Sequence, residues 1–169
     1  MSVRAEEYGV SSVAFRLNGR AVTIQASPTL PLADLLRDGC GLTSVKIGCS
    51  RAVCGSCTVL VDGRPAASCA LFAFHAEGTE VTTVEGLATP TGQRHPIQEA
   101  FADAAAFQCG YCTGGMMMLA KALLDSDPDP SRATVAEWIS ANVCRCTGYA
   151  MIIEAVLDAA RRMRGAAHA

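Results

Sequence analysis

Three cysteines within nine residues constrain this chain more than any other feature. Cys49, Cys54 and Cys57 are separated by four residues and then by two, and Cys69 follows after eleven more. The turn signal Asp62-Gly63 divides the segment before Cys69 into two short strands, so we expect Cys69 on the second strand of a hairpin. Three thiols on one loop and a fourth from a later segment could surround a compact metal centre.

The spacing of these four cysteines is typical of the ligands of a [2Fe–2S] cluster. Such a cluster with its four thiolates is an anion, and Gly48 and Gly55 would let backbone N–H groups approach it because glycine has no Cβ. A structural zinc ion, which also binds four thiolates, is the alternative. Zinc sites usually use two short Cys-x2–4-Cys hooks, whereas three cysteines share one loop here, so the pattern favours iron and sulfide.

A second cysteine motif occurs twice in the C-terminal half. Cys112-Thr113-Gly114 is repeated as Cys146-Thr147-Gly148, and each tripeptide precedes a predicted helix. Threonine is a good N-cap, so we expect each cysteine pair at the positive end of a helix dipole, a favourable place for an anionic cluster. The second predicted ligand set consists of Cys109, Cys112, Cys144 and Cys146.

The remaining cysteine, Cys40, lies outside both sets of four. We expect it to be a small buried hydrophobic residue; a redox-sensitive thiol near the cluster is the alternative. The acidic N-terminal segment 1–7 lacks the apolar stretch of a signal peptide. Nine cysteines in a chain of 169 residues without an export signal favour metal ligation in a reducing compartment, so we expect a cytoplasmic protein.

Charge and hydropathy exclude two classes of partner. The formal net charge is −2, which gives no indication of nucleic-acid binding. No apolar run approaches the roughly 18 residues of a membrane-spanning helix. We therefore expect neither nucleic acid nor a membrane as a partner.

The pattern of residues changes near the middle of the chain, between a sheet-forming half and a helical half. We place the boundary between a first domain of residues 1–86 and a second of residues 87–169, with a linker at 88–94. In the first half we expect a hairpin around Asn18-Gly19, a short helical stripe after Pro31, and strands at 58–61, 64–69 and 80–84.

The helical half is predicted to contain four helices. The first starts at Pro96 and carries an apolar stripe that ends at Phe107; the others span 116–124, 133–141 and about 149–162. We interpret Met116, Met117 and Met118 as helix-bundle core, and Trp138 in the same way.

Taken together, these motifs resemble the small iron–sulfur subunit of the xanthine dehydrogenase family of molybdenum hydroxylases. The resemblance covers roughly residues 12–160. The residues that carry it are Gly41-Leu42-Thr43, Lys46-Ile47-Gly48-Cys49, Cys54-Gly55-Ser56-Cys57-Thr58-Val59, Gln108-Cys109-Gly110-Tyr111-Cys112 and Cys144-Arg145-Cys146-Thr147-Gly148-Tyr149.

The resemblance implies an α+β fold, with an N-terminal β-grasp plant-type ferredoxin domain followed by a C-terminal four-helix domain. It implies that Cys49, Cys54, Cys57 and Cys69 hold one [2Fe–2S] cluster and that the second set holds another, with Gln108 contacting the pterin. The implied partners are a large subunit with molybdopterin, in its cytosine dinucleotide form, and a medium subunit with FAD, assembled as a dimer of heterotrimers.

By the same resemblance, single electrons would pass from molybdenum through the helical-domain cluster and then the ferredoxin cluster to FAD. The chain shows no nucleophile–base pair and no phosphate-binding glycine loop, so we expect no substrate chemistry of its own. Two alternatives stay open: a stand-alone two-cluster electron carrier and a zinc-binding interaction module. The sequence departs from the family at Gly114, where proline is common, and around Arg51, where the loop is less rich in glycine.

Overall fold

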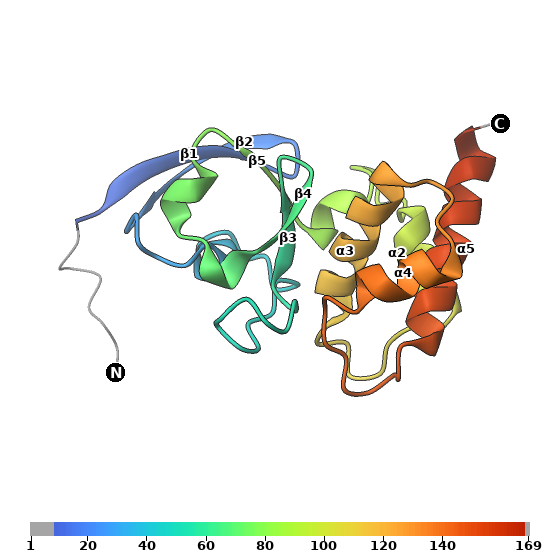
Figure 1. The fold of residues 1–169 in the computed structure, drawn as a ribbon. Coiled ribbons are helices and arrows are strands. Elements are labelled where there is room, and N and C mark those ends of the chain that lie inside the picture. The colour runs from blue at the N-terminus through green and yellow to red at the C-terminus, as the bar shows by residue number, and fades with distance from the viewer. Residues whose placement is uncertain (1–8, 168–169) are drawn as a thin grey trace.

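The computed structural model describes residues 9–167, so the segment 1–7 discussed above lies outside the described residues. A five-stranded sheet and its connections form one half of the molecule, and a group of helices forms the other (Figure 1). The fold is therefore a mixed one, with strands first and helices afterwards, in the order that the sequence predicts.

The sheet has the strand order β2-β1-β5-β3-β4. Its strands are β1 (Ser11–Leu17), β2 (Arg20–Ala26), β3 (Thr58–Val61), β4 (Arg64–Ala67) and β5 (Glu80–Thr82). Central strand β5 runs parallel to β1 and antiparallel to β3, and the two hairpins β1–β2 and β3–β4 flank it. Both hairpins turn on two residues with positive φ, Asn18-Gly19 and Asp62-Gly63, which is the twist that short hairpins favour.

A short helical segment packs beside the sheet, as the leucine stripe predicts. It consists of α1 (Leu32–Asp34) and a wider turn, η2 (Leu35–Gly39), with Leu32, Leu35 and Leu36 buried among the inward residues of β1 and β3. Val45 and Cys57, which lie before and at the end of the first cysteine loop, are buried in the same core. Cys40, which follows η2, is half-buried against the same core.

The expected position of Cys69 is wrong by two residues. Strand β4 ends at Ala67, and Cys69 lies in the following 3-10 turn, η3 (Ser68–Ala70). The Ser68 hydroxyl donates a 2.7 Å hydrogen bond to the carbonyl oxygen of Cys57, and this bond ties the start of the turn to the end of the first cysteine loop. The turn brings the thiol back towards the cysteine loop.

The helical half consists of α2 (Pro96–Asp103), α3 (Thr113–Ser126), α4 (Arg132–Ile139) and α5 (Ala150–Ala167). Helix α5 packs along α2 and α4, and α3 lies between them and the sheet (Figure 1). Met116 is buried in the helix-bundle core and Met117 packs against it, as predicted, whereas Met118 is buried at the contact with the sheet.

The expected roles of four residues in this half need correction. Thr113 does not cap α3, because the helix begins at Thr113 itself and Cys112 occupies the N-cap position. Thr147 lies three residues before α5, where its hydroxyl accepts the N–H of Tyr149 instead of capping the helix. Phe107 is 42% exposed, because α2 already ends at Asp103. Trp138 is 37% exposed, and its Nε1–H donates a hydrogen bond to the Leu119 carbonyl oxygen of α3.

The two halves share a small apolar contact that places the sheet against α3. Leu60 of β3 packs against Met118 and Ala122, and all three are buried. Val84 and Leu87, from the turn η5 (Val84–Leu87) that leads into the linker, cover this cluster. Within residues 9–167, none of the helices has the length and apolar character needed to cross a membrane.

Candidate metal centres

The first cysteine loop directs backbone N–H groups at its own sulfur atoms. The N–H groups of Val53 and Cys54 lie 3.3 and 3.4 Å from the Sγ of Cys49, and the N–H of Ala52 lies 3.4 Å from the Sγ of Cys69. Ser50 and Ala52 adopt positive φ, which turns these N–H groups inwards. The N–H groups of Arg51, Cys54 and Val53 lower the pKa of the Cys49 thiol to about 6, so this sulfur is prepared to bind metal as a thiolate.

Cys57 and Cys69 form a closer pair on the inner side of the loop. Cys57 is 1% exposed, and burial, followed by the neighbouring Cys69 thiol, raises the pKa of Cys57 to about 11. A thiol in such surroundings is a poor anion by itself. A metal cation would supply the positive charge that makes its thiolate form stable there.

The second set comes from two loops, one before α3 and one before α5. The Sγ atoms of Cys109 and Cys146 are 3.5 Å apart, and the Thr147 hydroxyl donates to the Sγ of Cys144 at 3.1 Å. Burial, and then the neighbouring Cys144 thiol, raises the pKa of Cys112 to about 12. Burial also acts to raise the pKa of Cys144, but the Thr147 hydroxyl and backbone N–H groups outweigh it and lower that pKa.

In both sets the thiols associate in pairs. Cys57 lies with Cys69 and Cys49 with Cys54, while Cys109 lies with Cys146 and Cys112 with Cys144. Among the described residues, no three cysteine, histidine or acidic side chains converge as a site for a single metal ion. Two pairs of thiols, each able to hold one iron, match the ligand demand of a [2Fe–2S] cluster better than that of a single zinc ion. The residues present therefore fit the cluster.

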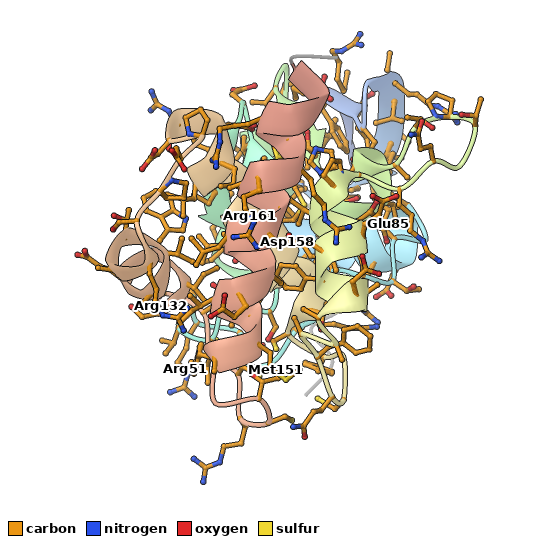
Figure 2. All side chains as sticks on the ribbon, turned by 90° about the vertical axis from the view of Figure 1, so that its right-hand side faces the viewer. Arg51, Glu85, Arg132, Met151, Asp158 and Arg161 are labelled. Carbon is orange, nitrogen blue, oxygen red and sulfur yellow. The ribbon has the colours of Figure 1, made fainter. Side chains whose placement is uncertain are left out.

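The two sets of cysteines lie next to each other at one end of the molecule. A cavity of about 240 Å³ is lined by Cys49 and Cys54 from the first loop and by all four cysteines of the second set. Figure 2 shows Arg51, from the first loop, and Met151, near the start of α5, at this same end. The tertiary fold thus places two cysteine sets that are far apart in sequence beside one another.

Two hydrogen bonds connect the loops directly. The N–H of Val143 donates to the carbonyl oxygen of Cys54 at 2.9 Å, and the Tyr111 hydroxyl donates to the carbonyl oxygen of Ile47 at 2.9 Å. Both donors come from segments that carry cysteines of the second set. The loops are therefore tied to each other as well as to their own halves.

The other predicted site residues have identifiable contacts. The Gln108 side-chain amide is exposed and donates to the Cys146 carbonyl oxygen at 3.1 Å, so it links the two loops of the second set. A Cβ added at Gly48 would lie 3.0 Å from the Sγ of Cys54, which explains a glycine there. At Gly55 the structure adds a constraint that the sequence did not predict: φ is +70° and a Cβ would overlap the side chain of Asn142.

Sequence reasoning missed Asn142, Tyr111 and Val143 as contacts between the two loops. Asn142 and Val143 immediately precede Cys144, and Tyr111 lies between Cys109 and Cys112. Their position next to predicted ligands was the one feature of the sequence that could have pointed to them. Nothing in the sequence showed which residue of the other loop each would meet.

Two family models match this chain. Residues 15–87 match the family described as 2Fe-2S iron-sulfur cluster binding domain, and residues 83–157 match the [2Fe-2S] binding domain family. A solved structure of quinoline 2-oxidoreductase from Pseudomonas putida 86 superimposes with a TM-score of 0.88 at 43% identity, covering 92% of this chain and 97% of that one.

Two relatives of similar length carry functional names. The nicotinate dehydrogenase small FeS subunit of Eubacterium barkeri is 46% identical over 151 residues, which is 89% of this chain and 96% of the relative. The xanthine dehydrogenase iron-sulfur-binding subunit of Escherichia coli O157:H7 is 45% identical over 145 residues, covering 84% and 89%. The chain therefore belongs to the family of small [2Fe–2S] iron–sulfur subunits of the xanthine dehydrogenase, or molybdenum hydroxylase, family.

Proposed function

We propose that this chain is the electron-transfer subunit of a molybdenum-containing hydroxylase. In this proposal it relays single electrons from the molybdopterin centre of a large subunit, through two [2Fe–2S] clusters, to FAD on a medium subunit. The observation that carries the proposal is the arrangement of two complete sets of four cysteines on adjoining loops. A relay needs two centres close together, whereas a simple one-electron carrier needs only one.

The residues of this chain would hold and orient the clusters. Cys49, Cys54, Cys57 and Cys69 are the proposed ligands of the first, and Cys109, Cys112, Cys144 and Cys146 those of the second. The bound clusters would supply reversible one-electron chemistry. The N–H groups directed at Cys49 and Cys69 stabilise negative charge on sulfur, and hydrogen bonds to cluster sulfurs are one way in which proteins set the reduction potential.

We further propose the finer architecture that the resemblance implies. Residues 1–86 would form a β-grasp plant-type ferredoxin domain, and residues 87–169 a four-helix domain. The strand order with β5 at the centre and the grouping of α2, α3, α4 and α5 support this division. A cytoplasmic location and a dimer of heterotrimers belong to the same proposal.

Exposed apolar residues near the cysteines favour a subunit over a free carrier. Val53, Phe107, Tyr111, Val143 and Met151 are 42–62% exposed, and each lies within five residues of a cysteine in one of the two sets. Apolar side chains gathered near a redox site are typical of a surface that another protein covers. Gln108, from the same surface, is the proposed contact to the pterin.

Purification of the native complex through a tag on this chain tests the proposal. We expect larger subunits to co-purify and to release a molybdopterin nucleotide and FAD on denaturation. Each copy of this chain should contain about four irons and four acid-labile sulfides, with negligible zinc, because it has two complete ligand sets. After reduction, EPR should show two distinct signals.

Two results would contradict this proposal in different ways. A colourless protein with one or two zinc ions would support the zinc-binding module instead. A red-brown monomer with both EPR signals, but without molybdopterin or FAD partners, would support the stand-alone two-cluster carrier. As a control, Cys112→Ser should remove one signal and leave the other, since it changes a single ligand set.

A further inference from the structure

A buried asparagine between α4 and Cys144 makes poor use of its hydrogen-bonding groups. Asn142 is 3% exposed, and its Oδ1 lies 3.4 Å from the Thr58 hydroxyl, which already donates to the Gly55 carbonyl oxygen at 2.7 Å. Its Nδ2 is buried without a partner among the described residues. A buried amide left unpaired is destabilising. The structure therefore shows no strong hydrogen bond from the Asn142 side chain.

The shape of Asn142 is matched by Gly55 on the first cysteine loop. A Cβ built on Gly55 would lie 1.6 Å from the Oδ1 and 2.1 Å from the Cγ of Asn142. The amide thus occupies the space that any other residue at position 55 would fill. Gly55 also has a φ of +70°, which glycine adopts without strain.

The backbone on either side of Gly55 is in close contact with the helical half. The N–H of Val143, next to Asn142, donates to the Cys54 carbonyl oxygen at 2.9 Å. On the other side, α3 approaches so closely that a Cβ on Gly115 would lie 2.2 Å from the Gly55 carbonyl oxygen. The helical half therefore clamps the residue that follows one cysteine of the first set.

We propose that Asn142 is a positioning residue, which seats against Gly55 and thereby fixes the separation and orientation of the two cysteine sets. Gly55 directly follows Cys54, and Cys144 comes two residues after Asn142, so this contact joins one proposed ligand of each cluster by a short path. The inference rests on the proposed function, because it concerns the geometry between two bound clusters. Asn142 contacts no substrate and acts only through the cysteine loops.

The magnetic interaction between the two reduced clusters measures this geometry. Two paramagnetic centres split or broaden each other's EPR signals, and the effect falls steeply with their separation. In the native complex carrying Asn142→Ala, we expect unchanged iron content and both EPR signals, but an altered interaction splitting. A residue that contributed only to stability would lower the melting temperature and leave the splitting of the folded protein unchanged.

Asn18 provides a matched control. A Cβ on Gly86 would lie 2.2 Å from the Asn18 Oδ1, so this asparagine seats over a glycine in the same way, and it bonds to Thr83 on a segment without cysteines. Asn18→Ala should lower the melting temperature at least as much as Asn142→Ala, because Asn18 also has positive φ. It should leave the splitting at its wild-type value.

A double-mutant cycle tests the contact itself. In Gly55→Ala the new methyl group would overlap the Oδ1, Cγ and Cβ of Asn142. In Gly55→Ala/Asn142→Ala, the Cβ of residue 142, 2.9 Å from the new methyl group, is the one of these three atoms that remains. The added methyl should therefore lower the melting temperature less in the Asn142→Ala background. If Asn142→Ala does not assemble, Asn142→Ser, which also removes the amide, replaces it in both the splitting measurement and the cycle.

The outcomes separate this inference from the proposed function. Unchanged splitting in a folded Asn142→Ala complex, or strictly additive effects in the cycle, would overturn the positioning role and leave the electron relay intact. A wild-type complex with fewer than two EPR signals would instead overturn the proposed function. A changed splitting in Asn18→Ala would show that any loss of stability disturbs the clusters, and would also remove the specific role of Asn142.

Discussion

The backbone N–H of Val143 donates a 2.9 Å hydrogen bond to the carbonyl oxygen of Cys54, and so links the two cysteine loops across the junction of the two halves. Main-chain groups make this bond, so it does not depend on the identity of either side chain. It depends on the two halves packing in one arrangement, which the buried contact of Leu60 with Met118 and Ala122 supports. The site and the junction between the halves are therefore one structural unit.

Replacement of Cys40 should leave both clusters in place. Cys40 lies outside both cysteine sets and packs against the core of the sheet half, where burial raises the pKa of its thiol. We expect Cys40→Ser to retain the iron content and both EPR signals, and to lose about 1 kcal/mol of stability or less, because the site is only half-buried. Loss of either EPR signal would show that the assignment of ligands is wrong.

Replacement of Gln108 should slow electron entry without removing a cluster. Gln108→Ala loses the 3.1 Å hydrogen bond to the Cys146 carbonyl, worth roughly 1 kcal/mol for a neutral pair at an exposed site. Iron content should therefore be retained. Substrate-driven reduction of the clusters in the assembled enzyme, followed by rapid-mixing spectroscopy, should become slower if Gln108 contacts the pterin.

Gln25→Ala is the matched control for this experiment, because Gln25 is an exposed glutamine on β2, in the other half of the molecule. The control should reduce at the wild-type rate. If Gln108→Ala leaves the rate of cluster reduction unchanged, Gln108 does not contribute to electron entry. Its role would then be limited to linking the two loops of the second set.

Glu85 should make stability depend on pH. Burial acts to raise the pKa of its carboxyl group, but hydrogen bonds from the hydroxyl groups of Ser44 and Thr83 and from the Ser44 N–H outweigh burial and lower that pKa. A carboxyl group whose pKa is lower in the folded than in the unfolded state stabilises the fold at pH values above its unfolded-state pKa. That contribution to stability is lost as the pH falls through the folded-state pKa.

We therefore expect Glu85→Gln to be less stable than the wild type at neutral pH by roughly 1–2 kcal/mol. This is the lower end of the range for hydrogen bonds to charged groups, because the Glu85 carboxylate is half exposed and solvent screens its charge. The difference should shrink as the pH falls below the ordinary glutamate pKa and through the lower folded pKa of Glu85, where the wild-type carboxyl becomes protonated. Thermal unfolding of both proteins from pH 3 to pH 8 measures it. A difference between Glu85→Gln and the wild type that stays constant over this pH range would contradict the assignment.

The sequence alone predicted those features that depend on local chemistry and spacing. The Asn18-Gly19 turn followed from residues that tolerate positive φ, and the paired strands followed from alternation on either side of it. The composition of the two cysteine sets followed from short spacings and a repeated tripeptide, and the motifs around them were specific enough to indicate the family. Helix ends were less certain: Thr113 and Thr147 were predicted as caps, yet neither caps its helix.

Only the tertiary structure decided how the two sets of cysteines relate to each other. Cys109 meets Cys146 across 37 residues, and Asn142 seats over Gly55 across a still longer separation. The position of Gly55 was predicted to matter, but for its approach to a cluster rather than for the room it leaves Asn142. Such pairings depend on how α3 and the loop before α5 pack against β3, and a one-dimensional pattern records residue types and spacings but not which distant surfaces come into contact.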